Sequence, residues 1–113
     1  MDIDIDDYKR INRHTGRIVG FNSDVVLLDD MEVELLQKFA DDLTKAKAVL
    51  IDLTISPQTN SERGLSIHKT MTKIHDIVDD TTEVIFGSNT DTTLKSSECR
   101  YHMILTGIKE QKI

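Results

Sequence analysis

The sequence is poor in the residues that build disulfide-rich, aromatic-rich or membrane-embedded proteins. Its 113 residues include one cysteine, one proline and no tryptophan, and aromatic side chains make up 4%. The lone Cys99 cannot support a disulfide framework, so we expect a reducing compartment and a thiol buried in a strand. No apolar run approaches the ~20 residues of a membrane span, and no signal peptide precedes the first acidic residues. We therefore expect a soluble, cytoplasmic protein whose core is built from Ile, Leu, Val and Met.

Motifs that carry chemistry are scarce as well. The net charge of -6 argues against nonspecific binding to nucleic acid or to an anionic membrane, because such binding needs a basic surface. No Gly-rich phosphate loop, Cys/His metal set or nucleophile elbow is found. His68 and His75 lie two helical turns apart, too far to share a metal. We expect a chain that is not an enzyme on its own and that binds no metal or cofactor alone.

The longest apolar run, residues 46–55, predicts a central strand. It is short, rich in β-branched residues and closed by Ser56-Pro57, which favours a strand over a helix. Because it is apolar on both parities, we expect both of its faces to be covered over much of its length.

The other elements are expected around this strand. The order predicted is helix, strand or hairpin, helix, strand, helix, strand, strand, in one domain over residues 1–113. The expected ranges are a helix from Asp4 that stops at Gly16, β structure over 17–28 as a hairpin or a bulged strand, a helix capped by Asp29 or Asp30 and reaching Leu43, a helix over 62–78, and strands over 83–87 and 99–107, with a loose tail over 109–113. This order predicts an α+β fold with a mixed sheet.

The acidic start is the most unusual stretch. Asp2, Asp4, Asp6 and Asp7 resemble the beginning of a calcium loop, but Asp7 stands where a sharp-turn glycine is needed. Arg13 also replaces the closing glutamate of such a loop. The plain alternative is a solvated helix start, with Asp4 as N-cap and Asp6 and Asp7 in the first turn, where the helix dipole favours negative charge.

From Ala46 onward the chain resembles the C-terminal domain of FtsZ, the tubulin-like bacterial cell-division GTPase. The segments that carry the resemblance are Ala46 to Thr54, then Val84-Ile85-Phe86-Gly87 followed by Asp91, and Arg100 leading to Thr106-Gly107-Ile108. In that family a similar strand leads through a loop and a helix to an "IIFG" strand, and a strand ending in "ATG" closes the domain. The resemblance implies a mixed four-stranded sheet with helices packed mainly on one face, an architecture that is also chorismate-mutase-like.

The N-terminal stretch resembles a further FtsZ element, the acidic synergy loop of pattern Asn-x-Asp-x-x-Asp. By this resemblance Asp4 and Asp7 occupy the two acidic positions, and Asp2 replaces the asparagine. In the family this loop enters the nucleotide pocket of the next protomer in a filament and completes its GTPase site. The resemblance thus implies catalytic roles in trans for Asp4 and Asp7, with GTP and Mg²⁺ held only by a partner protomer.

The sequence departs from the FtsZ pattern in several places. Residues 16–43 match weakly, Ile55 stands where a glycine often follows the strand, and no adaptor-binding tail peptide follows Ile108. A second hypothesis is therefore a stand-alone interaction module or homo-oligomeric scaffold with no role in GTP hydrolysis. A third is an independent small-molecule enzyme, although fold alone does not confer activity. Either an excised domain or a complete gene product fits the chain.

Overall fold

The structure is a computed structural model, and it describes residues 5–14, 16–59 and 61–108. Within these ranges three helices and five strands follow the expected order. The elements are α1 (Ile5–Asn12), β1 (Arg17–Asn22), β2 (Val26–Leu27), α2 (Leu28–Lys45), β3 (Ala48–Ile55), α3 (Ser61–Ile77), β4 (Glu83–Thr90) and β5 (Glu98–Ile108). The predicted tail over 109–113 lies outside the described residues.

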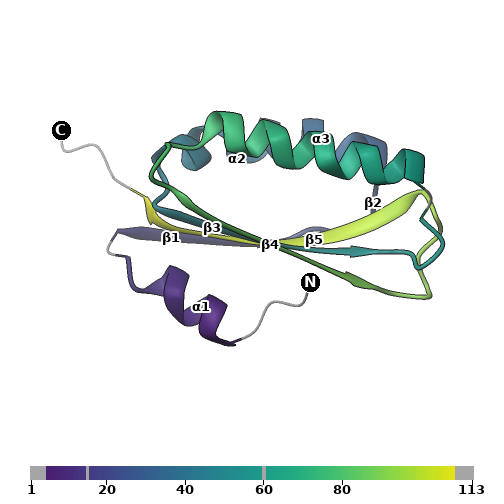
Figure 1. Cartoon of the computed structure of the whole chain (residues 1–113), viewed down its shortest axis with the longest axis horizontal. Helices are drawn as coiled ribbons and strands as arrows, with labels where there is room; N and C mark the ends of the chain where they lie inside the picture. Colours follow the sequence, from purple (N-terminus) through teal and green to yellow (C-terminus); the bar gives the residue numbers. More distant parts are fainter. Residues whose placement is uncertain (1–4, 15, 60, 109–113) are drawn as a thin grey trace.

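The strands form one mixed sheet in the order β1-β5-β3-β4, with β2 paired to β5. β3 runs parallel to β4 and antiparallel to β5, and β1 is antiparallel to β5. Figure 1 shows α2 and α3 covering one face of the sheet and α1 lying beneath the other. The α+β class and the mixed sheet are confirmed, and the short β2 adds a fifth strand to the four expected.

The central strand is buried on both faces over its first half, as its composition predicts. Val49, Ile51 and Leu53 point towards α2 and α3 and belong to the main core. Ala48 and Leu50 point the other way, into a smaller cluster with Ile11 and Ile85. Because α1 supplies Ile11, the lower face of β3 is sealed at the end where the strand begins. The strand can thus be buried on both faces although α1 is the only described helix on the face opposite α2 and α3.

The second helix has the expected apolar stripe but a different start. Its buried positions include Met31, Leu35, Phe39 and Leu43, which share one face at helical spacing. The predicted cap at Asp29 or Asp30 is wrong, because the helix begins at Leu28 and no side chain caps it. The Leu28 N–H instead donates to the carbonyl of Ser97 at 2.8 Å. A contact distant in sequence thus satisfies a donor that a local cap would otherwise take.

Residues 17–27 form an interrupted edge strand rather than a hairpin. Both β1 and β2 pair with β5, through Asn22 opposite His102 and Val26 opposite Cys99. Between these two pairs the chain advances by four residues from Asn22 to Val26 but by only three in β5. The extra residue in the edge strand is that of a β-bulge. Of the two alternatives left open by the sequence, the bulged strand is therefore correct.

Glycine is required at two backbone positions that lie close together. Gly107 has φ of 68° and lies in β5 where the register with β1 shifts, opposite the Arg17 to Val19 step. Gly16 has φ of 126°, and a Cβ there would lie 2.9 Å from the Gly107 carbonyl carbon. The prediction that Gly16 stops α1 is wrong, because that helix already ends at Asn12. It instead lets the chain turn closely against β5.

Candidate functional site

The first helix is fixed to the sheet by its second half. Ile11 is fully buried against Ala48, Leu50 and Ile85. The Thr106 hydroxyl, also buried, donates to the Ile11 carbonyl at 2.5 Å. This bond satisfies a carbonyl in the last turn of α1, which lacks a partner within the helix. The helix is therefore held at a set depth below the sheet.

The first turn of α1 carries two carboxylates, Asp6 and Asp7, which we call the acidic turn. Asp6 is exposed, and the Asp7 side chain retains 23% exposure and pairs with Arg10 at 3.6 Å. Arg10 also forms an ion pair with Glu83 at the start of β4. Negative charge at this end of the helix is favoured by the helix dipole. The acidic turn is thus accessible from outside and connected to the sheet.

Of the three predicted site residues, the structure places one. Asp7 lies in the first turn of α1, as predicted. Asp2 and Asp4 lie outside the described residues, and so does the expected cap formed by Asp4. The geometry described for the acidic site is therefore that of Asp7 and its neighbours Asp6 and Arg10.

Beyond α1, the lower face of the sheet is polar. Figure 1 shows that α1 underlies only one end of the sheet. Along the rest of this face, strand register brings together six side chains that we call the polar face: Asn22, Asp52, Thr54, Asn89, Arg100 and His102. Most of these residues line an open hollow of about 310 Å³. The sequence analysis missed this surface. Its signal is that Asp52 and Thr54, and likewise Arg100 and His102, are polar residues two positions apart in a strand, so each pair lies on one face of the sheet.

Side chains of the polar face are joined by hydrogen bonds across the strands. Asn89 Nδ2 donates to Asp52 Oδ1 at 2.9 Å, and the Thr54 hydroxyl donates to Asn89 Oδ1 at 2.8 Å. His102 Nδ1 lies 2.5 Å from Asn22 Oδ1. In these contacts no hydroxyl is paired with a histidine. These contacts connect the side chains of neighbouring strands across this face of the sheet.

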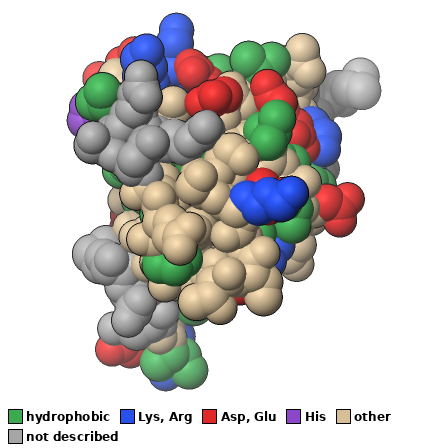
Figure 2. Space-filling view, turned by 90° about the vertical axis from the view of Figure 1, so that its right-hand side faces the viewer, with side chains coloured by type: hydrophobic (Ala, Val, Ile, Leu, Met, Phe, Trp, Pro, Cys, Tyr) green, Lys and Arg blue, Asp and Glu red, His purple; other side chains and the backbone are tan. Residues whose placement is uncertain are grey.

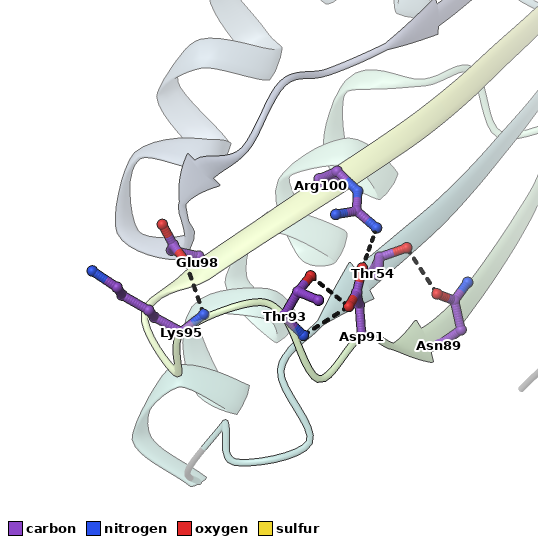
Figure 3. A network of polar contacts seen from close by, with 7 residues as sticks. All are labelled: Thr54, Asn89, Asp91, Thr93, Lys95, Glu98 and Arg100. Carbon is purple, nitrogen blue, oxygen red and sulfur yellow. Dashed lines mark hydrogen bonds and ion pairs between the residues drawn. The ribbon is translucent and has the colours of Figure 1, made fainter.

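Asp91 lies beside Arg100 of the polar face, as Figure 3 shows. Its Oδ1 accepts hydrogen bonds from the Thr93 hydroxyl at 2.6 Å and the Thr93 N–H at 2.8 Å. Arg100 Nη2 lies 2.7 Å from Asp91 Oδ2. The Thr93 hydroxyl first, and Arg100 next, lower the pKa of Asp91 from 3.8 to about 2, since both stabilise the charged carboxylate. This contact fixes the loop after β4 to the start of β5.

The end of the molecule where β3 and β4 finish is mostly uncharged. Figure 2 views this end and shows tan surface over much of its centre, with a basic side chain beside it and acidic side chains mainly further out. The loops here supply Ser, Thr and Gln, including Ser56-Pro57-Gln58-Thr59.

The described part of the chain contains neither a grouped set of metal ligands nor an exposed thiol. There, no three His, Cys, Asp or Glu side chains are grouped so as to hold a metal ion. Cys99 is fully buried in β5, as predicted, and burial raises the pKa of its thiol to about 12. A thiol with such a pKa is protonated and inert at neutral pH. None of the helices in this part of the chain combines the length and apolarity that a membrane span requires.

Comparison with known proteins gives similarity in structure but not in sequence. No family model and no curated protein matches the chain. A point mutant of FtsZ from M. jannaschii matches with TM-score 0.71 and 17% identity, covering 96% of this chain and 33% of that one. An empty FtsZ dimer from M. jannaschii gives 0.66 and 16%, covering 95% and 32%. CetZ1 from Haloferax volcanii, a GDP-bound monomer, gives 0.63 and 14%, covering 95% and 34%.

These matches show an FtsZ/tubulin-like fold at low sequence identity. The chain spans about a third of the length of each of the three proteins. The architecture of a mixed sheet with two helices on one face and one beneath it is consistent with the FtsZ C-terminal domain.

Proposed function

We propose that this chain is an FtsZ-like assembly domain that presents its acidic segment, residues 2–7, to the GTP site of a neighbouring protomer in a cell-division filament. The observation that carries the proposal is the position of the acidic turn. Asp6 and Asp7 lie in the first turn of a helix whose last turn is anchored to the sheet, on the face opposite α2 and α3. In this position carboxylates can reach a second molecule.

The chemistry proposed for these carboxylates is phosphoryl transfer in trans. A carboxylate beside a bound triphosphate can orient the attacking water or help to hold a cation, and positioning of this kind dominates such catalysis. Asp4 and Asp7 are the proposed catalytic residues, and Asp2 contributes less. GTP and Mg²⁺ would come with the partner protomer, so the chain would complete a GTPase site without being an enzyme alone.

The partner proposed is an FtsZ-like nucleotide-binding protomer, with homo-oligomerisation as a further possibility for the same fold. The net charge of -6 supports a protein partner over nucleic acid or an anionic membrane. A cytoplasmic location follows from this partner.

The test is to mix the chain with a polymerising FtsZ-type GTPase and to measure phosphate release and sedimentable polymer. We expect the native chain to change both quantities and the double variant Asp4→Ala with Asp7→Ala to lose the effect on phosphate release. A matched control, Asp24→Ala with Asp80→Ala, removes two exposed carboxylates elsewhere and should behave as the native chain does.

Two results would contradict the proposal. If the native chain changes neither phosphate release nor polymer, it does not act on such a partner. If polymer responds equally to the native chain and to the Asp4 and Asp7 double variant, with phosphate release unaffected, the chain is an interaction scaffold instead.

A further inference from the structure

We propose that Arg10 is a positioning residue that sets the direction of the Asp7 carboxylate, an inference that rests on the proposed function. The Arg10 guanidinium lies between two carboxylates. Its Nη2 is 3.6 Å from Asp7 Oδ1, and its Nε pairs with Glu83 Oε1. Arg10 therefore links the acidic turn to the first residue of an edge strand.

The other anchors of α1 are Tyr8 and Ile11, the residues that directly follow Asp7 and Arg10 in the chain. Ile11 is buried below β3, and its carbonyl accepts the bond from Thr106. Two apolar side chains and one hydrogen bond to a backbone carbonyl fix the depth of the helix below the sheet. The link from Asp7 through Arg10 to Glu83 adds a restraint of a different kind, because it acts on the Asp7 carboxylate itself. The carboxylate is then held in one direction relative to the sheet.

The geometry suits positioning better than stabilisation. The Arg10 side chain is 47% exposed, and exposed ion pairs contribute little to the free energy of unfolding. The planar guanidinium offers five N–H donors in a rigid fork, so it can hold two carboxylates at once. Loss of Arg10 should therefore disturb the direction of Asp7 while leaving the fold intact.

Arg13 provides a natural control. Its Nη2 lies 3.8 Å from the other oxygen of Glu83, and it is 66% exposed. Arg13 follows the last helical residue, Asn12, whereas Arg10 lies within the helix one turn from Asp7. Replacing Arg13 removes the same charge near the same carboxylate while leaving the Asp7 to Arg10 to Glu83 link in place.

The first measurement is phosphate release by a polymerising FtsZ-type GTPase at increasing concentrations of the variants Arg10→Ala, Glu83→Gln and Arg13→Ala. A displacement of about 1 Å can cost a catalytic group up to ~100-fold, so we expect about tenfold lower maximal stimulation for Arg10→Ala and Glu83→Gln. The concentration for half-maximal effect should stay unchanged, because docking does not depend on the link. Arg13→Ala should match the native chain, and equal losses in all three variants would show a net-charge effect and overturn the proposal.

The second measurement does not depend on a partner. The ¹H–¹⁵N heteronuclear NOE of the Asp6 and Asp7 amides reports the order of the acidic turn, and thermal unfolding reports the whole domain. We expect the NOE to fall in Arg10→Ala and Glu83→Gln but not in Arg13→Ala, with midpoints of unfolding close to that of the native chain. An unchanged NOE in the first two variants would overturn the proposal.

The two measurements separate the possible failures. If the native chain gives no stimulation but the NOE falls as expected, the proposed function fails and the restraint by Arg10 stands. If stimulation by the native chain is strong, and the NOE falls without any loss of stimulation, the direction of Asp7 does not matter and the positioning role is refuted.

Discussion

Replacement of Ile11 by alanine tests whether α1 is a packed part of the domain. Ile11 is fully buried in a small cluster with Ala48, Leu50 and Ile85, beneath β3. The change removes about three carbons at roughly 0.8 kcal/mol each, or about 2.4 kcal/mol of transfer free energy. A cavity term would add to this, but a helix at the surface can settle into the space. We expect a loss of about 2–3 kcal/mol from a total free energy of unfolding of roughly 5–15 kcal/mol.

The assay is urea unfolding followed by circular dichroism, with Ile11→Val and Ile18→Ala as controls. Ile11→Val should cost about 1 kcal/mol, because the smaller cavity is more easily filled. Ile18 is 56% exposed, so Ile18→Ala should stay within about 0.5 kcal/mol of the native chain. If Ile11→Ala has no larger effect than Ile18→Ala, α1 is not docked against the sheet and the position argued for the acidic turn is wrong.

Three further predictions follow from single residues. Gly107→Ala should lower the free energy of unfolding by about 2 kcal/mol in the same assay, because φ is 68° and the new Cβ would lie 2.6 Å from Lys47 Cβ. The control Gly20→Ala, whose new Cβ has no neighbour within 4 Å, should have a smaller effect, and equal effects of the two variants would contradict this. The Asp91 carboxylate, with its pKa lowered from 3.8 to about 2, stabilises the fold above pH 4, and this contribution is lost as pH falls towards 2. Urea midpoints of Asp91→Asn should therefore lie below those of the native chain at pH 6 and converge with them near pH 2, and a constant gap would refute the assignment. Cys99 should resist a thiol reagent at pH 8 in the folded chain and react fully in urea, and labelling at the unfolded rate would disprove its burial.

The parts of the fold predicted from sequence are those set by composition and spacing. The apolar run ending at Ile55 predicts β3 because both of its faces are buried over the first half. The stripe from Met31 to Leu43 predicts α2 because one helix face packs on the sheet. Cys99 was correctly placed in a buried strand for the same reason. In each case a short segment contains the information that determines its own structure.

The errors arise where distant segments meet. The start of α2 depends on the Ser97 carbonyl, which lies far along the chain from Leu28, so local capping rules failed there. Likewise, residues 17–27 form a bulged edge strand and not a hairpin because both of their halves pair with β5 instead of with each other. The polar face was missed because its side chains come from four strands that only the register brings together. For the acidic site, the sequence predicted the position of Asp7 but not its link through Arg10 to Glu83.

The position of β5 within the sheet has a consequence for synthesis on the ribosome. It is the last described strand in the chain, yet it lies between β1 and β3 and pairs Arg17 with Ile108. Until this strand has been translated and released from the exit tunnel, β1 has no neighbour to bond with and β3 has one open side. Nascent chains would expose apolar strand surface throughout that interval, when association with other chains is most dangerous. Contacts that span nearly the whole described chain also make such a domain a slow folder for its size.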